Sequence, residues 1–197
     1  MRDQGDTRSR IQAVALELFT EQGYEATSLR EIAERLGVTK AALYYHFKTK
    51  DDIVASLMED RAGAMRELVE WAEPQEHTVG LRREFIRRYA RQLHEGGHHN
   101  LMRFLERNQT ALRDHPKSEE MRDLMLRTVE ILSEPGDPLT VRLKCAMSIF
   151  AMHATWFVIR DDSISDEARS AASLEVALEL IEPAGAARTP EPAGAEA

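Results

Sequence analysis

The segment from residue 39 to residue 50 combines side chains that suit contact with a charged polymer. Its sequence, TKAALYYHFKTK, places Tyr44 and Tyr45 beside small alanines and between lysines. Lysines neutralise phosphates, tyrosine hydroxyls donate to phosphate oxygens, and alanines let a backbone approach closely and contact thymine methyl groups. These residue types favour a DNA-binding surface. The alternative is a tyrosine pair half-buried against the following helix, and spacing alone leaves both open.

Short helices must position this segment. Four apolar residues share one face of a predicted first helix that Gly23 closes: Ile11, Ala15, Leu18 and Phe19. Thr27 or Ser28 then caps a second helix, which ends at Gly37 and has its own apolar stripe: Leu29, Ile32, Ala33 and Leu36. Thr39 caps a third helix through His46. Two short helices joined by a glycine turn are what a helix-turn-helix requires.

The third helix has two chemically different sides. Leu43 and Phe47 are spaced to face the core together with Leu36 of the preceding helix. The opposite side carries the polar and small residues: Lys40, Ala41, Tyr44, Tyr45 and Lys48. The second side is therefore the predicted binding surface.

The rest of the chain is also predicted to be helical, so the fold class is all-α. Thr49 and Asp52 have capping-box spacing at the start of a long helix, which ends before Pro74. Glycine and proline divide the remainder into helices near residues 78–95, 98–114, 118–133, 139–160 and 166–182. We expect a DNA-binding domain at residues 1–50, a larger helical domain at 51–182 and a disordered tail at 183–197.

Charge is distributed unevenly along the 197 residues. The formal net charge is −8, yet residues 1–50 contain eight Lys and Arg against seven Asp and Glu. The acidic excess therefore lies downstream, where it would repel DNA from all but the N-terminal domain. A single cysteine and no apolar leader predict a cytoplasmic protein. The longest apolar stretch, residues 145–159, is too short and polar to span a membrane.

The N-terminal pattern resembles the TetR family of bacterial repressors over roughly residues 8–57. The matching positions are Ile11, Ala15, Leu18, Phe19, Gly23, Tyr24, Thr27, Ser28, Ile32, Ala33, Gly37, Val38, Leu43, Tyr44, Tyr45, His46, Phe47 and Lys50. The resemblance implies that one set faces the major groove of double-stranded DNA: Lys40, Ala41, Ala42, Tyr44 and Tyr45. It implies that a second set holds phosphates: Thr27, Ser28, Tyr45, His46 and Lys50. Arg30 matches a position from which some members reach a base.

The same resemblance implies a homodimer that binds a small-molecule effector in its helical body. Release of a pseudo-palindromic operator by that ligand would make the protein a repressor. The two C-terminal helices are the candidates for the dimer interface. The candidate effector contacts are Phe104, Met125, Trp156 and His153, although plain core packing explains most apolar residues of the body. His153 requires a polar partner, and a satisfied core histidine is the alternative.

Other clusters favour simpler interpretations. His94, His98 and His99 flank a glycine pair and lack a second set of ligands, so we expect no metal site and no cofactor. Cys145 has no resolving cysteine and is expected to be inert and buried. The pairs Arg82-Arg83 and Arg87-Arg88 could meet an anionic effector, but a solvated face is the default.

Two other functional classes were compared with the DNA-binding regulator. No nucleophile elbow, phosphate loop or paired metal-ligand motif occurs in the sequence, which argues against an enzyme. A helical protein-interaction adaptor would use the same amphipathic helices without sequence-specific DNA binding. The N-terminal pattern favours the regulator over both.

Overall fold

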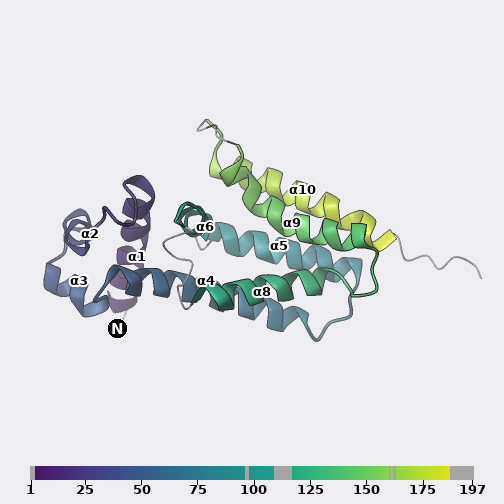
Figure 1. The fold of residues 1–197 in the computed structure, drawn as a ribbon, viewed down its shortest axis with the longest axis horizontal. Helices are drawn as coiled ribbons and strands as arrows, with labels where there is room; N and C mark the ends of the chain where they lie inside the picture. Colours follow the sequence, from purple (N-terminus) through teal and green to yellow (C-terminus); the bar gives the residue numbers. More distant parts are fainter. Residues whose placement is uncertain (1–2, 96–97, 109–116, 160, 162, 187–197) are drawn as a thin grey trace, which may run out of the picture. The chain divides into compact units, whose positions relative to one another are not determined.

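The computed structural model describes residues 3–95, 98–108, 117–159, 161 and 163–186 (Figure 1). The described residues form helices and no strands, as predicted. The helices are α1 (Asp3–Glu21), α2 (Leu29–Leu36), α3 (Lys40–His46), α4 (Lys50–Ala72), α5 (Val79–Glu95), α6 (His98–Arg107), α8 (Lys117–Leu132), α9 (Leu139–Phe157) and α10 (Asp166–Ala186). In these ranges, no helix is long and apolar enough to cross a membrane.

Most helix ends agree with the predicted signals, and α10 differs most clearly. It continues through Pro183 to Ala186, four residues beyond the expected end at residue 182. Residues 187–197 of the predicted tail lie outside the described residues, as do residues 109–114 of the helix predicted near 98–114.

Two compact units divide the chain, and the boundary falls inside α4. The first contains residues up to Glu67 together with residues 92–124, and the second contains residues 68–91 and those from Met125 onward. The first unit therefore includes α6 and the start of α8 as well as the three N-terminal helices, which is more than the predicted domain of residues 1–50.

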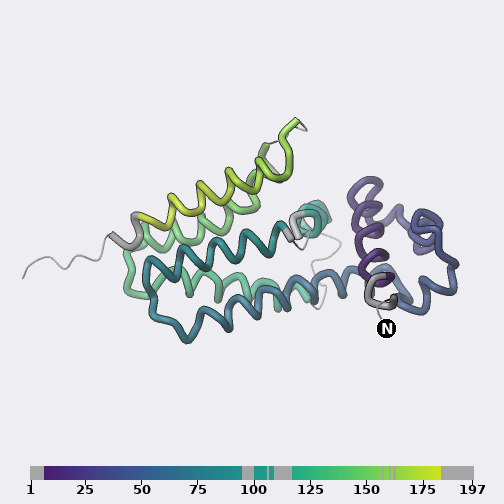
Figure 2. Tube along the Cα trace, turned by 180° about the vertical axis from the view of Figure 1, so that it is seen from behind, coloured from purple at the N-terminus to yellow at the C-terminus, as the bar shows by residue number. Residues whose placement is uncertain are grey.

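The first unit is built around a core that joins α1, α2, α3, α4 and α6. Its fully buried side chains include Ile11, Ile32, Leu43, Ile53 and Phe104. Burial of each such side chain contributes about 1.5–3 kcal/mol. Figure 2 shows α2 and α3 beside α1, so the short helices are fixed by packing and not by their own length.

The second unit contains the pair α9 and α10, which lie side by side (Figure 1). On α9, Cys145, Ile149 and Met152 are buried, and Ala177 and Ile181 are buried on α10. The expected burial of Cys145 is confirmed. Its Sγ donates to the Leu132 carbonyl over 3.0 Å, and burial raises the pKa of the thiol.

A buried ion pair fixes the turn between α8 and α9. Arg82 on α5 contacts Asp137 at 3.2 Å, with the two side chains only 2% and 4% exposed. Asp137 also accepts a hydrogen bond from the Glu134 backbone at 2.9 Å. The expectation of a solvated face is therefore wrong for Arg82, because a carboxylate distant in sequence compensates its burial.

Candidate nucleic-acid interface

The start of α2 is fixed by a capping box at Ser28. The Ser28 side chain accepts a hydrogen bond from the Glu31 backbone at 3.2 Å, and the Glu31 carboxylate accepts from the Ser28 backbone at 2.7 Å. The hydrogen bond from the Ser28 hydroxyl is the main cause that lowers the pKa of Glu31. Two otherwise unpaired donors at the helix end are thereby satisfied, so Ser28 holds α2 at a defined angle while its side chain stays exposed.

Arg30 projects from the first turn of α2 into solvent. Its side chain is exposed, and its Nε lies 2.9 Å from the Glu34 carboxylate, one helical turn later. An exposed pair at this spacing contributes little to stability. Arg30 can therefore leave Glu34 and contact a nucleic acid with little loss of folding stability.

Gly37 makes the corner between α2 and α3. Its φ of +71° lies in the left-handed region that side chains other than glycine rarely adopt. The next residue, Val38, donates its backbone hydrogen to the Ala33 carbonyl at 3.0 Å, which closes the end of α2. Thr39 then caps α3 by accepting from the Ala42 backbone at 3.1 Å, as predicted.

The two sides of α3 are as different in the structure as in the sequence. Leu43 is fully buried and Phe47, which follows the helix, is nearly so. The opposite side presents its exposed residues together: Lys40, Ala41, Ala42 and Tyr45. Tyr45 is 69% exposed, and the His46 ring stands edge-on to it with 5.2 Å between ring centres. His46 itself is half-buried.

The tyrosine pair is divided between the two alternatives that the sequence left open. Tyr44 is half-buried and packs against the core, and the Lys40 ammonium lies 5.3 Å from the centre of its ring. Tyr45 is free to reach a partner. Of the two hydroxyls, that of Tyr45 is the better placed to contact a phosphate or a base.

Two predicted phosphate contacts are turned inward. Thr27 is 1% exposed, and its hydroxyl donates to the Gly23 carbonyl at 2.8 Å. Lys50 donates to the carbonyls of Tyr24 at 2.6 Å and Glu25 at 3.3 Å. Both side chains fix the turn between α1 and α2 in this structure, and neither extends toward solvent.

Tyr24 joins this turn to three helices. Its hydroxyl donates to Asp51 at the start of α4, and burial is the main cause that raises its pKa. The Tyr24 ring lies 5.1 Å from that of Phe19 on α1 and 5.9 Å from that of Phe104 on α6. The sequence pattern does not predict these roles of Asp51 and Phe104, because contacts across 27 and 80 residues leave no local periodic signal.

Comparisons with known proteins agree with this architecture. A family described as "Bacterial regulatory proteins, tetR family" matches residues 11–57. The structure of AmtR from Mycobacterium smegmatis superposes with a TM-score of 0.59 and 25% identity, covering 90% of this chain and 91% of that one.

The segment at residues 11–57 belongs to the tetR family.

Two curated relatives match this chain over a shorter length. The HTH-type transcriptional regulator AcrR from Shigella flexneri is 50% identical over 54 residues, which is 27% of this chain and 25% of AcrR. The HTH-type transcriptional repressor KstR2 from Rhodococcus jostii (strain RHA1) is 36% identical over 66 residues, or 32% of each chain. This chain thus spans about a quarter of the length of the first relative and about a third of the second.

The predicted effector contacts fall into both compact units. Phe104 is fully buried in the first unit, where its ring stacks on Phe19 at 5.4 Å. Met125, His153 and Trp156 belong to the second unit, in which Met125 and Trp156 are half-buried. His153 shares a 2.8 Å hydrogen bond with Tyr89, which supplies the polar partner that its burial requires. Phe104 is therefore a packing residue in this structure.

The candidate metal cluster is only partly described. His94 is exposed, whereas the side chains of His98 and His99 lie outside the described residues. Among the side chains that are described, no group of three or more His, Cys, Asp or Glu is arranged to hold a metal ion.

Proposed function

We propose that this protein is a DNA-binding transcriptional regulator of the TetR type that binds a pseudo-palindromic operator as a homodimer. The observation that carries the proposal is the exposed side of α3, where Lys40, Ala41, Ala42 and Tyr45 lie together on a helix whose other side is buried. A rigid helix that presents small and cationic residues suits insertion into the major groove.

Each exposed residue would have a different role. The Lys40 ammonium would contact a phosphate or a guanine edge, and the Tyr45 hydroxyl would donate to a phosphate. Ala41 and Ala42 would let the backbone approach and contact thymine methyl groups. Ser28 and Arg30 would approach the DNA from α2, whereas Thr27 and Lys50 would support the site from within, with Tyr44 and His46 at its edge.

Dimerisation is assigned to α9 and α10. An exposed apolar stripe follows α9 at intervals of three and four residues: Leu139, Leu143, Met147 and Phe150. Val176 adds an exposed apolar side chain on α10. Such a stripe on paired helices suits packing against the same pair of a second subunit, which would place two copies of α3 about 34–36 Å apart or at a larger spacing.

Repression with release by a small molecule is the proposed output. Met125, His153 and Trp156 are the effector contacts that we retain, and Phe104 is withdrawn from that set. The ligand and the operator would prefer different conformations, so each would weaken binding of the other by the same factor. The α4 helix, which begins beside Tyr24 and crosses the unit boundary, is the proposed connection.

The DNA test is selection of bound duplexes from a random pool at near-physiological salt, followed by a mobility-shift titration of the enriched site. We expect a pseudo-palindrome and a loss of about tenfold in affinity for Lys40→Ala and for Tyr45→Ala. Arg122→Ala, which removes an exposed cation on α8, is the matched control. Absence of enrichment from folded, dimeric protein would overturn the proposal and favour the adaptor.

The dimer test compares two exposed leucines. Leu143→Glu lies in the α9 stripe and should shift the protein from dimer to monomer in light scattering. Leu126→Glu lies on α8 outside that stripe and should leave the dimer intact. Equal behaviour of the two variants would contradict the assigned interface.

A further inference from the structure

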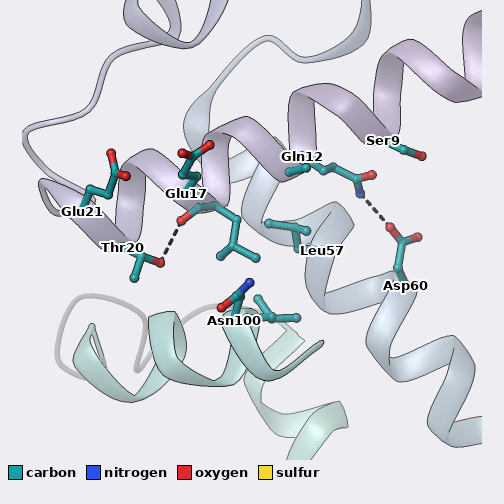
Figure 3. Close-up of a pocket in the computed structure, with 11 residues that line it drawn as sticks. Ser9, Gln12, Glu17, Thr20, Glu21, Leu57, Asp60 and Asn100 are labelled. Carbon is teal, nitrogen blue, oxygen red and sulfur yellow. Dashed lines mark hydrogen bonds between the residues drawn. The ribbon is translucent and has the colours of Figure 1, made fainter. Parts of the chain in front are cut away.

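A cavity of about 540 Å³ lies in the first compact unit between α1, α4 and α6 (Figure 3). Its volume is in the range of small-molecule sites. The lining residues of α1 extend from Ser9 to Glu21, a rise of about 18 Å along the helix. The cavity is therefore elongated, and it is distinct from the effector residues proposed in the second unit.

The middle of the cavity is apolar. Leu16 on α1 and Leu101 on α6 are buried, and Leu57 on α4 is half-buried, and all three line the space. Contact with three leucine side chains suits the hydrocarbon part of a ligand.

One end of the cavity has unused hydrogen-bonding capacity around Gln12 and Asp60. Gln12 is 6% exposed, and its amide nitrogen donates to Ser56 at 2.9 Å and to Asp60 at 2.6 Å. In the described part of the chain, the amide oxygen of Gln12 accepts no hydrogen bond, and Asp60 has no cationic partner. An amide oxygen that accepts no hydrogen bond, beside an accessible carboxylate, suits an ammonium group.

The other end of the cavity suits a neutral group. Asn100 lines it from α6, and its amide makes no hydrogen bond with the described residues. Figure 3 shows the Glu17 and Glu21 carboxylates on the side of α1 away from Asn100. Arg35 approaches these two carboxylates at 3.5 and 3.7 Å. Glu17 and Glu21 also line this end of the cavity, but Arg35 partly compensates their charge, whereas Asp60 has no cationic partner among the described residues.

We propose that this cavity binds an elongated organic cation, with the ammonium group at Asp60 and Gln12 and the hydrocarbon part against Leu16, Leu57 and Leu101. The opposite end of the ligand would meet the Asn100 amide. The proposal is independent of the proposed DNA-binding function, because every group that it uses is present without an operator.

Three probes of one shape and different charge test the assignment by calorimetry on the full chain: 4-phenylbutylammonium, 4-phenylbutanol and 4-phenylbutyrate. We expect the ammonium to bind about fivefold more tightly than the alcohol, and the carboxylate to bind weakest. Asp60→Asn should abolish the preference for the ammonium. Asp123→Asn removes an exposed carboxylate on α8 and should preserve that preference. Equal affinity for the three probes, or no binding, would overturn the proposal.

A second variant locates the bound probe. Ala13 is exposed and lines the cavity, so the indole of Ala13→Trp should fill the space without disturbing the core. The affinity for the ammonium probe should then fall by about tenfold. Undiminished binding by the folded variant would place the probe elsewhere and refute the assignment. Operator binding by the same preparations is measured separately, so failure of one proposal is distinguishable from failure of the other.

Discussion

The ammonium group of Lys50 lies 2.6 Å from the backbone carbonyl oxygen of Tyr24 and 4.6 Å from the centre of its ring. One side chain at the start of α4 therefore closes the turn that leads from α1 to α2. The carboxylate of Asp51, the next residue, accepts a hydrogen bond from the Tyr24 hydroxyl. The beginning of α4 is consequently part of the structure that positions the DNA-binding helices.

Replacement of Lys50 by methionine should lower the free energy of unfolding by about 1 kcal/mol, because charge-assisted hydrogen bonds to two carbonyls are lost at a partly exposed site. Operator affinity should fall as well, since the turn before α2 is loosened. Urea denaturation and a mobility-shift titration provide the two measurements. Lys40→Met is the comparison, and it should lower affinity while leaving stability nearly unchanged. The reverse pattern would show that Lys50 acts through direct contact with DNA.

Arg169 should be important for the end of α9. Its guanidinium donates to the carbonyls of Thr155 at 2.7 Å, Ile159 at 2.8 Å and Asp161. A cation at a helix C-terminus satisfies free carbonyls and complements the helix dipole. We expect Arg169→Gln to destabilise the protein by about 2 kcal/mol in chemical denaturation. Arg142→Gln, at an exposed site on α9 itself, should lower the free energy of unfolding much less. Equal losses for the two variants would argue against the capping role of Arg169.

The Arg82–Asp137 pair predicts a non-additive mutant cycle. Asp137→Ala leaves a buried guanidinium uncompensated and should cost about 3–5 kcal/mol of unfolding free energy. The double variant Arg82→Met with Asp137→Ala should be less destabilised than the sum of the single changes. Urea denaturation of the four proteins measures the coupling. Additive losses would mean that the pair does not interact.

The capping box makes part of the stability dependent on pH. Hydrogen bonds from Ser28 lower the pKa of Glu31 below its ordinary value near 4.5. A carboxyl group whose pKa is lower in the folded state stabilises that state above the unfolded pKa, and the contribution disappears as pH falls through the folded value. Ser28→Ala should lower the thermal midpoint by about 2–4 °C at pH 7.

The difference between wild type and Ser28→Ala should shrink as the pH falls through the lowered folded pKa of Glu31, where the carboxylate becomes protonated in both proteins. An NMR titration of the Glu31 side chain should show its pKa rising toward the ordinary value in the variant. Ser118→Ala, outside the capping box, is the control. A difference that stays constant through the titration of Glu31 would contradict the role of its carboxylate.

Local signals in the sequence were sufficient to predict the helices and their caps. Ser28, Gly37 and Thr39 each act through bonds within four residues, so the sequence pattern contains the whole interaction. Periodicity also predicted that Leu43 lies on the buried side of α3 and Lys40 on the exposed side. These features depend on the backbone period, which neighbouring residues determine.

Predictions for individual side chains were less complete where a distant partner decides. Phe104 was expected to line an effector site, yet its ring packs against the rings of Phe19 and Tyr24. Lys50 was expected to face a phosphate, and the carbonyls of the α1–α2 turn hold its ammonium instead. Residue type predicted the capacity of each group to interact, but tertiary packing selected the partner.

The exposed pair Ala41 and Ala42 has an evolutionary consequence. Their methyl groups take no part in the buried core, and Leu43 beside them supplies the packing. Substitutions at these two positions can therefore accumulate with little penalty to folding. With the DNA contacts proposed above, descendants of this sequence could acquire new operator preferences by changing two codons, while the scaffold that presents them is inherited intact.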